Sequence, residues 1–318
     1  MPIASTSRHR LSLVKELEYG VTPASPSFQL VRNTDVSLAL TKETLQSNEM
    51  REDRQISGFK HGNKQVGGDI SIDFSYESFD PLLEAALCGT WSKDVLTVGI
   101  EQHSFTFERF FTDIGQYHRF TGVQINTLSL SVAPNAMVTG TFGTLGSDMV
   151  SDTKVIADAT YGDNLITQPF DSFSGSLLVN GKPSNVVTSV ELSLENGLEP
   201  RFVVGSANTR EPSIGNSNIS GSMSVFFEDS TMIDQFINED EVSLKFSLNG
   251  QSGGYDFELP RIKFSSGTPE KDGNSYIINM SFQGLPDDNG VNLRITRVPI
   301  NADVERVSVS TNDFQLEI

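Results

Sequence analysis

The fold is decided by the stretch Gly67-Gly-Asp-Ile-Ser-Ile-Asp-Phe-Ser-Tyr76, which continues as Glu77-Ser-Phe-Asp-Pro-Leu-Leu-Glu-Ala-Ala-Leu-Cys-Gly89. In its first part, apolar and polar residues alternate from Asp69 to Phe74, and a period of two with one apolar face predicts a half-buried strand. In its second part the period changes to that of a helix. Asp80 is expected as the N-cap and Gly89 as the end of this helix. Its buried face is expected to consist of Leu82, Leu83, Ala86 and Leu87.

The same unit occurs a second time in the chain. Gly221-Ser-Met-Ser-Val-Phe-Phe227 has the same alternation, and a helical pattern follows with apolar residues at the matching positions, Met232, Ile233, Phe236 and Ile237. Upstream, Val36–Leu40 corresponds to Val190–Leu194. Val36 precedes Gly68 by 32 residues, and Val190 precedes Gly221 by 31. This internal repeat predicts a tandem duplication.

The composition indicates a globular β-rich chain. A length of 318 residues is ample for two domains. Frequent Phe, Ser, Thr and Gly favour strands and turns. No apolar run reaches the roughly 18 residues of a membrane span, and residues 1–13 lack the apolar core of about 7–15 residues that a secretory signal requires. The single cysteine, Cys88, excludes an intrachain disulfide and is expected to be buried as a small hydrophobic residue.

The net charge of −18 constrains the partners of the protein. Residues 1–150 carry −5 and residues 151–318 carry −13. Such a chain is poorly suited to bind nucleic acid through its phosphates, which needs Lys and Arg that displace counterions. Two interpretations remain: the charge serves solubility alone, or it forms a surface that repels nucleic acid.

The pattern divides the chain into five segments. These are an N-terminal arm (1–34), a first domain (35–146), a linker with the first hairpin strand of the second domain (147–185), a second domain (186–284) and a C-terminal extension (285–318). In each domain we expect a strand, a long loop, a strand, a short helix, a strand and a hairpin. The aromatic strand Phe105–Phe107 is matched with Tyr255–Phe257, and a bulge is expected near Asn126.

Turn residues place the hairpins of the second domain. Asn180-Gly181 is expected to join Phe173–Val179 to Val186–Leu194, and Asn249-Gly250 to join Val242–Leu248 to Tyr255–Leu259. In the C-terminal extension, one or two further strands are expected to pair in cis or to reach a neighbour. Their apolar residues are Leu293, Ile295, Val298, Val307 and Val309.

Two polar segments, residues 41–66 and 195–220, occupy matching positions in the two halves. Both are too long for tight hairpins, and long loops in compact proteins are often functional. We expect them to contact a neighbouring subunit or ring. The candidate contact residues are Glu49, Arg51, Glu52, Asp53, Arg54, Arg201 and Arg210.

No catalytic or metal-binding motif emerges from the residues. None of the four histidines has a second ligand at metal-site spacing, so we expect no catalytic residue, no metal and no cofactor. Asp287-Asp-Asn-Gly lacks the closing acid of a calcium loop and is expected to be a turn. A third class is an enzyme such as a β-sandwich glycosidase, which needs two carboxylates about 5–10 Å apart, and nothing in the sequence singles out such a pair. Aromatic residues are expected to pack in the core rather than form a ligand platform: Phe105, Phe107, Phe110 and Phe111.

Several motifs together resemble a known family. Thr44–Gln55, the pair Gly67-Gly68 with its alternating strand, and Ser78–Trp91 are similar to the tail tube protein of long-tailed, non-contractile bacteriophages. The resemblance is strongest over residues 15–146 and extends to residue 284. The segments 1–14 and 285–318 have no counterpart in it.

The resemblance implies a mainly β fold with two tandem β-sandwich or β-barrel-like domains, each with one short flanking helix. It implies a structural protein rather than an enzyme, found in the virion tail and made in the bacterial host cytoplasm. Three two-domain chains would form a pseudo-sixfold ring, and stacked rings would form a tube. Its partners would be further copies of itself and other tail proteins, such as the tape measure, distal tail and tail terminator proteins. DNA would pass through transiently, and no membrane would be bound.

In such a tube the polar side of the alternating strands would line the lumen. The lumen candidates are Asp69, Ser71, Asp73, Ser222 and Ser224. An acidic lumen would keep DNA from sticking, because DNA is itself densely negative. The alternative function is a receptor- or carbohydrate-binding β-domain protein of a virion or cell surface. Such a protein would display aromatic residues on its loops, whereas the loops here are charged and glycine-rich.

Overall fold

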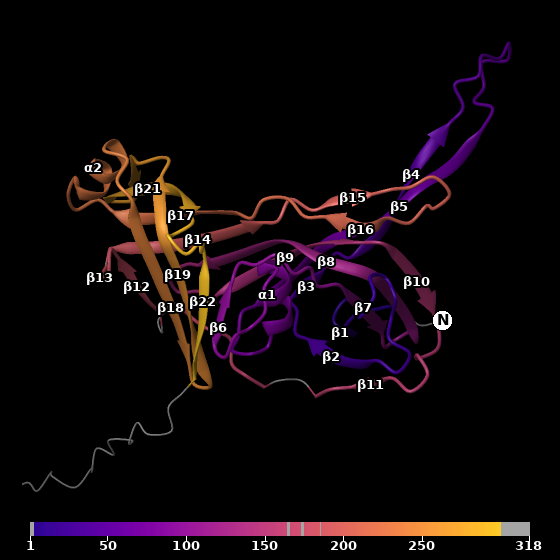
Figure 1. The fold of residues 1–318 in the computed structure, drawn as a ribbon, viewed down its shortest axis with the longest axis horizontal. Coiled ribbons are helices and arrows are strands. Elements are labelled where there is room, and N and C mark those ends of the chain that lie inside the picture. Colours follow the sequence, from indigo (N-terminus) through magenta and orange to yellow (C-terminus); the bar gives the residue numbers. More distant parts are fainter. Residues whose placement is uncertain (1–2, 164–165, 173–174, 185, 300–318) are drawn as a thin grey trace, which may run out of the picture.

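The computed structural model describes residues 3–163, 166–172, 175–184 and 186–299 (Figure 1). The fold is mainly β, as expected, with strands layered into two sandwich-like halves and two short helices. No helix among the described residues is long and apolar enough to cross a membrane.

One continuous sheet joins the two halves. Its successive neighbours are β4 (Ala39–Gln46), β5 (Phe59–Asp73), β9 (Thr139–Gly146), β8 (Gln116–Val132), β14 (Val187–Glu195), β17 (Asn218–Phe226), β21 (Ser275–Leu285) and β20 (Thr268–Asp272). The short β3 (Asp35–Val36) pairs with β5 beside β4. The two halves meet at the antiparallel pair β8·β14. Within the described residues, β4 and β20 pair on one side only, so they form the two open edges of this sheet.

A second layer covers each half on the apolar side of the continuous sheet. In the first half it contains β2 (Ser27–Val31), β1 (His9–Lys15), β7 (Phe105–Phe111), the start of β8 and β10 (Asp148–Asp152). In the second half it contains β13 (Lys182–Pro183), β12 (Gly175–Val179), β18 (Val242–Gly250), β19 (Gly253–Phe264), β22 (Arg294–Pro299) and β6 (Val95–Thr97). β11 (Thr160–Tyr161) pairs with β2.

The core lies between these layers and is built by the period-two pattern. Ile70, Ile72 and Phe74 are almost fully buried, as the alternation predicted. Around Phe74 lies a cluster of aromatic rings from both halves, Phe79, Phe170, Tyr255 and Phe257. The apolar core is therefore shared by the two halves.

Helix α1 (Asp80–Leu87) follows β5 and buries Leu82, Leu83, Ala85, Ala86 and Leu87. The expected N-cap is wrong: Phe79 occupies that position, because the Asp80 carboxylate bonds to the second half instead. The expected end at Gly89 is also one residue late, since Cys88 takes the left-handed conformation with φ of 48°. Gly89 is needed for another reason, because a Cβ there would lie 2.3 Å from the Thr97 carbonyl oxygen.

The segment expected as an N-terminal arm (1–34) instead supplies β1 and β2, which bury Leu11, Leu13 and Phe28 in the first half. The linker 147–185 likewise supplies β10 and β11 to the first half and β12 and β13 to the second. Of these strands only β12 corresponds to an expected one, the first hairpin strand of the second domain, because the pairing of the others depends on residues distant in the chain.

The two long polar segments are not loops throughout, because each contains strands, and this corrects the expectation. β4 and residues 59–67 of β5 pair in a long hairpin, and its outer part projects from the body as an arm, visible at the upper right of Figure 1. Residues 199–201 and 210–213 form β15 (Glu199–Arg201) and β16 (Arg210–Ser213), a smaller hairpin running in the same direction. The arm is exposed on both sides, so it lacks the apolar face that identifies a strand.

Several turns and pairings differ from expectation. Asn180-Gly181 forms a turn with positive φ at both residues, but it joins β12 to β13, and the main partner of β12 is β18. The turn between β18 and β19 lies after Gly250, because Gly250 pairs with Gly253. The bulge near Asn126 is confirmed by a register shift between Ile125 and Thr127.

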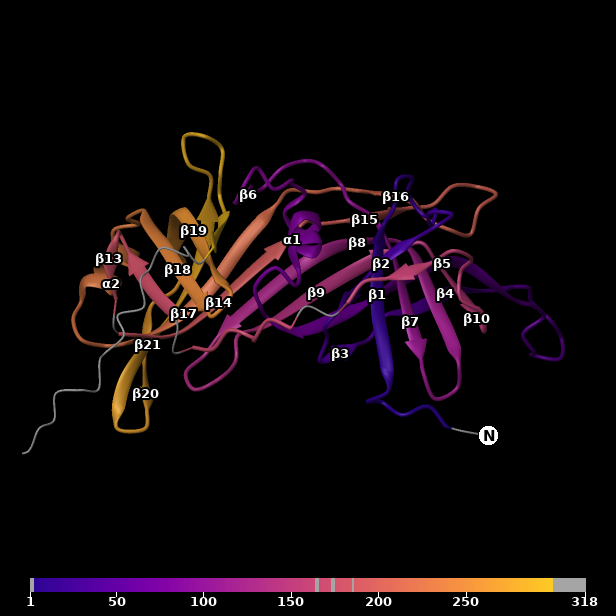
Figure 2. The ribbon, with the colours of Figure 1, turned by 90° about the horizontal axis from the view of Figure 1, so that it is seen from below.

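The C-terminal extension pairs in cis. β22 lies between β19 of the second half and β6 of the first half, with Leu293 and Ile295 buried. It therefore joins the two halves within the second layer, whereas the β8·β14 pair joins them in the continuous sheet; Figure 2 shows β6 of the first half close to β19 of the second. Val307 and Val309 lie outside the described residues.

Candidate functional site

The side of the continuous sheet that faces away from the core is mostly polar on every strand, with Phe226 and Ile277 as an apolar pair on β17 and β21. Because side chains alternate along each strand, the residues between the buried apolar positions all point to this side. We call it the polar face. Its middle is hollowed into a trough of about 630 Å³, lined mainly by Ser129, Ser131, Thr139, Thr141, Glu191, Ser193, Ser220, Ser222, Ser265, Ser281 and Gln283.

All five lumen candidates lie on the polar face. Asp69, Ser71 and Asp73 are on β5, and Ser222 and Ser224 are on β17. Three strands, β9, β8 and β14, separate the two groups. At about 4.8 Å per strand, the groups are roughly 19 Å apart. The structure thus places them on one surface without bringing them into contact.

The sequence reasoning missed the middle of this face. Glu191, Ser193 and Glu195 project from β14 at the junction of the halves, and all three are exposed. Ser129 and Ser131 project from β8 beside them. The signal was present, because Thr127–Val132 and Val190–Glu195 alternate polar and apolar residues as strictly as Asp69–Phe74 does.

Cross-strand hydrogen bonds satisfy many hydroxyl groups of the polar face. The Ser222 hydroxyl donates to the Glu191 carboxylate at 3.2 Å, and the Ser224 hydroxyl donates to the side-chain oxygen of Asn279 at 2.7 Å. The carboxylates of the face remain at its surface, with Lys263 of β19 as a cation on the same side, opposite Gln283. The polar face is therefore rich in acceptors and acidic groups.

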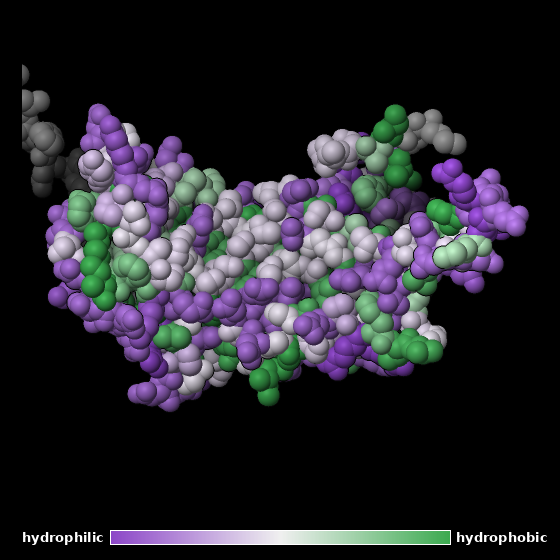
Figure 3. All heavy atoms as spheres, turned by 90° about the horizontal axis from the view of Figure 1, so that it is seen from above, coloured by the Kyte–Doolittle hydropathy of each residue, from purple (hydrophilic) through white to green (hydrophobic). Residues whose placement is uncertain are grey.

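The view in Figure 3 shows how hydropathy is distributed on one side of the molecule. Pale and purple side chains dominate the middle, and the strongly hydrophobic ones gather toward the ends and the lower border. On this side of the molecule, exposed apolar groups thus lie toward the ends and the lower border, away from the middle.

The candidate contact residues fall into two separate places. Glu49, Arg51, Glu52, Asp53 and Arg54 lie in the loop at the tip of the arm, where the Arg51 guanidinium and the Asp53 carboxylate form an ion pair at 2.7 Å. Apolar side chains accompany them, with Met50 99% exposed. The two remaining candidates, Arg201 and Arg210, face each other across the β15·β16 hairpin.

Asp148 connects the base of the arm to the smaller hairpin. Its carboxylate accepts hydrogen bonds from the Lys64 ammonium at 3.2 Å and from the Asn208 side chain at 3.0 Å. Burial raises the pKa of Asp148, but the hydrogen bonds from Met149, Asn208 and Lys64 together hold this pKa below its usual value. The loop of the smaller hairpin is thus fixed to the base of the arm.

A polar clamp fixes the two halves relative to each other. Asp80, at the start of α1, accepts a hydrogen bond from the Tyr255 hydroxyl and pairs with the Arg297 guanidinium at 2.7 Å. Arg297 also lies over the ring of Trp91 at 3.8 Å. Burial is the main cause that raises the pKa of Asp80, and the bonds to Tyr255 and Arg297 oppose it. These contacts join α1 of the first half to β19 and β22 of the second.

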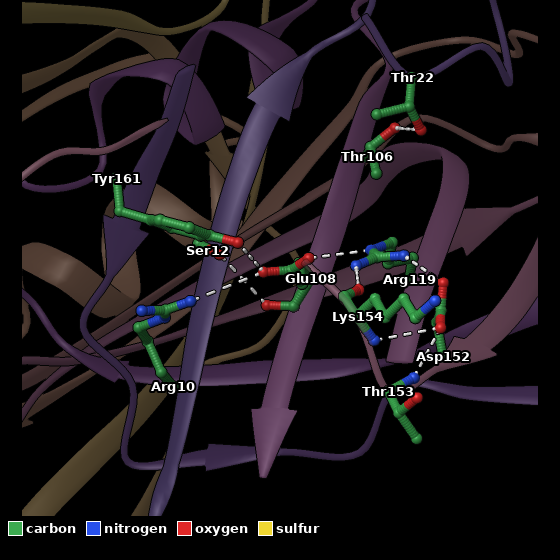
Figure 4. Close-up of polar contacts among 10 residues, drawn as sticks. All are labelled: Arg10, Ser12, Thr22, Thr106, Glu108, Arg119, Asp152, Thr153, Lys154 and Tyr161. Atoms are coloured by element: carbon green, nitrogen blue, oxygen red, sulfur yellow. Dashed lines mark hydrogen bonds and ion pairs between the residues drawn. The ribbon is translucent and has the colours of Figure 1, made fainter. Parts of the chain in front are cut away.

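A second cluster of charges is buried inside the first half (Figure 4). The fully buried Glu108 carboxylate is bonded by the Arg119 guanidinium at 2.9 Å and the Tyr161 hydroxyl at 2.6 Å, and Arg10 lies 3.6 Å away. Arg119 reaches on to Asp152 at 3.4 Å. Because every charged group has a partner, the cluster ties β11 and the edge strand β10 to β1, β7 and β8.

The phenylalanines of β7 and the single cysteine pack against other residues of the protein. Phe105 and Phe107 are buried, whereas Phe110 and Phe111 are half-buried and contact Tyr117 and His118. Cys88 is buried, and this burial raises the pKa of its thiol to about 11. Across the part of the chain that the structure describes, no three His, Cys, Asp or Glu residues are grouped to hold a metal ion.

Comparison with known proteins gives one clear family. A search of curated proteins finds no match. The family model described as phage tail tube protein matches residues 6–295, which is nearly the whole chain and includes both halves, the polar face and both hairpins. This chain therefore belongs to the phage tail tube protein family.

Proposed function

We propose that this protein forms rings that stack into the tail tube of a bacteriophage, and that the polar face lines the lumen through which DNA leaves the virion. The single observation that carries the proposal is the continuous sheet, which is apolar on one side, polar on the other and open at both edges. An open edge is a liability unless it is paired, and a closed ring of chains pairs every edge.

The strand pairing supports a tandem duplication. Val36 lies opposite Ile70 in the first half, and Val190 lies opposite Met223 in the second. These are the residues that the repeat in the sequence aligns. On the next strand, Ile70 is opposite Phe142, just as Met223 is opposite Met280. We infer that the repeat extends beyond the expected 35–146 and 186–284, because β1 and β2 pair in the first half as β12 and β13 do in the second.

Two pairs of glycines support the same inference. A Cβ on Gly68 would lie 2.5 Å from the Ser37 carbonyl oxygen, and one on Gly221 would lie 2.3 Å from the Glu191 carbonyl oxygen. A Cβ on Gly146 would meet the Val66 side chain at 3.1 Å, and one on Gly284 would meet the Ile219 side chain at 3.1 Å. Within this alignment the sequence match of Phe105–Phe107 with Tyr255–Phe257 is wrong. Val242–Leu244 takes that place, because both segments carry a bulge and pair with Val123 and Ile262 respectively.

Three duplicated chains would give a ring of six similar units. The lumen would then carry Ser and Thr hydroxyls together with carboxylates from every unit, including Asp69, Asp73 and Glu191. Phosphates of the passing DNA would be repelled rather than bound. In this role the protein acts as a conduit, not an enzyme, and its partners would be further copies of itself, the tape measure, distal tail and tail terminator proteins.

Electron microscopy of the purified protein tests this proposal. We expect rings or tubes with a continuous central channel. A protein that stays monomeric at high concentration, and that does not enter tubes when tail initiation complexes are supplied, would contradict it and would favour a binding module instead.

We also propose that the arm contacts a neighbouring subunit or ring. Replacing residues 48–57 by Asn-Gly would shorten the arm while keeping the pair formed by Ser47 and Gly58. We expect an unchanged unfolding transition, because the removed residues are exposed, together with loss of tubes in the electron microscope. Normal tubes from the shortened protein would refute a contact role for the arm tip.

A further inference from the structure

We propose that the junction between the two halves of one chain is the template for the junction between two chains. In this arrangement β20 of one subunit pairs with β4 of the next, and residues 42–44 of that second subunit cover helix α2 (Thr231–Ile237) of the first. The inference rests on the proposed ring and on the duplication, and it adds a register and a docking surface.

The intrachain junction has a defined register. Ser129 of β8 lies opposite Ser193 of β14, and both project from the polar face. The main-chain N–H of Asn196 donates to the Asn126 carbonyl, so the even-numbered residues of β14 bond to β8. Ser129 and Ser193 therefore form a pair that shares no main-chain hydrogen bond, with Cα atoms about 4.5 Å apart.

Each member of this pair has an equivalent on an open edge. Ser129 lies opposite Thr141 of β9, and Thr141 lies opposite Ser71 of β5 on its other side. Likewise, Thr268 lies opposite Asn279 of β21, and Asn279 lies opposite Ser224 of β17 on its other side. In the same way, Ser193 is opposite Ser220, and Ala39 is opposite Gly67. Since the repeat aligns Ser71 with Ser224 and Gly67 with Ser220, Ala39 of one chain should lie opposite Thr268 of its neighbour.

The segment after β14 covers helix α1 within the chain. The Asn196 side chain donates to the Ala86 carbonyl at 2.8 Å, at the C-terminal end of α1. Leu198 lines the same small pocket as Ala85 and Cys88. Together with the chain's own residues 99–103, this segment leaves the C-terminal end of α1 buried, with Leu87 fully inaccessible.

Helix α2 has the corresponding apolar residues but no comparable cover. None of its residues is buried, and Ile237, which aligns with Leu87, is 67% exposed. Its connection to the next strand is only Asn238 to Glu241, so nothing replaces residues 99–103. The end of α2 is thus an apolar helix face left open at the end of the molecule opposite the arm (Figure 1).

The equivalent of the covering segment is the base of the arm. Lys42 aligns with Asn196, and Thr44 with Leu198. A lysine there would meet the carbonyl end of α2, where the helix dipole favours a cation. The exposed acidic run Glu239-Asp-Glu241 follows directly. Charge and position therefore both indicate a second copy of this chain as the occupant of α2.

Pro269 makes the open edge of β20 selective. The Phe227 N–H donates to the Tyr276 carbonyl, so Ile278 also bonds toward β17. Pro269 is opposite Ile278, and its nitrogen consequently faces the open edge. This edge lacks one donor and pairs less well with an arbitrary strand. Docking of residues 42–44 on α2 supplies the additional contact that selects the correct partner.

Engineered disulfides test the register. We would combine Ala39→Cys with Thr268→Cys, since a spacing of about 4.5 Å between Cα atoms suits a disulfide. The positive control is Ser129→Cys with Ser193→Cys, which should close within one chain. The negative control is Ala39→Cys with Asp272→Cys, on the same strand but about 13 Å away. Each variant is first shown to form tubes under reducing conditions.

After oxidation of the tubes, denaturing gels should show linked chains for the 39/268 pair at least tenfold above the 39/272 pair. Closure of the 129/193 control with no link in 39/268 tubes would overturn the inference and leave the tube function standing. A link in 39/272 tubes would overturn the register. If neither wild type nor variants form rings or tubes, the proposed function fails together with the inference.

Discussion

At the scale of single residues, two glycines allow neighbouring strands of the continuous sheet to approach closely enough to pair. Gly221 has no positive φ, so its requirement is one of space alone: a Cβ would lie 2.3 Å from the Glu191 carbonyl oxygen and 2.4 Å from the Phe282 ring. For Gly68, a Cβ would lie 2.5 Å from the Ser37 carbonyl oxygen, and its φ is in addition +138°. The sequence alignment found both glycines, but not why they are needed.

We expect Gly221→Ala to lower the free energy of unfolding by about 2 kcal/mol, because two strands must separate to admit the methyl group. Gly58→Ala is the control, since a Cβ there has only Ser47 at 3.7 Å. It should change the free energy by less than about 0.5 kcal/mol. Urea unfolding of the unassembled protein measures both, and equal effects would contradict the packing argument.

Asp148→Asn tests the contact between the hairpins through its pH dependence. The folded-state pKa of Asp148 is lowered, so its charge contributes stability above its unfolded pKa of about 3.9, and this contribution is lost as the pH falls through the folded pKa. We expect the variant to be less stable at pH 7 by up to about 1 kcal/mol.

The difference between wild type and Asp148→Asn should shrink below about pH 4, where the wild-type carboxylate is progressively protonated. Asp288→Asn, an exposed position, is the control. Unfolding curves at pH 7 and pH 3 provide the measurement. A difference that stays constant across this range would mean that the charge of Asp148 plays no part.

At the scale of elements, prediction from sequence succeeded where one face of a strand or helix is buried. Asp69–Phe74, α1 and the bulge at Asn126 are all marked by apolar residues at a fixed period. It failed for the arm, because residues 41–46 and 59–61 are exposed and residues 62–65 are all half-buried, so neither strand carries a periodic signal. It also placed residues 1–34 outside the first domain, because β1 and β2 belong to that half only through the pairing of β1 with the distant β7 and of β2 with β1.

The positions of side chains that bond across elements could not be predicted either. Asp80 is a good N-cap by local rules, yet Tyr255 and Arg297 draw its carboxylate away from the helix. These partners are 175 residues or more distant in the chain. The polar face was predicted in part, since two of its strands were identified, while its centre at Glu191 depends on the β8·β14 pairing.

For helix α2, we expect Ile237→Asp to leave folding unchanged, because the side chain is 67% exposed, and to abolish assembly by placing a carboxylate at the junction between chains. Lys42→Glu should act in the same way from the other side of that junction. Ile100→Asp, with a side chain that is 91% exposed elsewhere, is the control.

Mixing the two variants gives a sharper result. A chain with Lys42→Glu keeps a native α2, and a chain with Ile237→Asp keeps a native arm base, so one native junction can form between them. We expect a one-to-one dimer by analytical ultracentrifugation, while each variant alone stays monomeric. A mixture that remains monomeric would place Lys42 and Ile237 outside a shared contact.

At the scale of the whole molecule, the two halves are joined at several places, so that the chain can enter a ring as one unit. The β8·β14 pair joins them on one side, β22·β6 joins them on the other, and the Asp80–Arg297 clamp lies between. A ring built from such chains needs only three contacts between subunits instead of six. The other three contacts lie within chains, so their formation costs no further entropy of association.

The acidic lumen gives the last prediction. Replacing Asp69 and Asp73 by Lys changes exposed or half-exposed positions of the polar face and should cost within about 0.5 kcal/mol of stability per site. In each ring the change would put cations where phosphates pass. Ejection of DNA from reconstituted virions should slow, and the delay should be larger at low salt, where screening is weakest.

The control carries the same charge change away from the polar face, with Glu18→Lys and Asp288→Lys, both exposed. If net charge alone governed ejection, both double variants would slow it equally. If the polar face lines the lumen, only the Asp69 and Asp73 variant should respond to salt, because only its lysines meet DNA within a Debye length of about 10 Å. Equal ejection by wild type and the Asp69 and Asp73 variant, with normal tubes, would move this face to the outside of the tube or to the contact between rings.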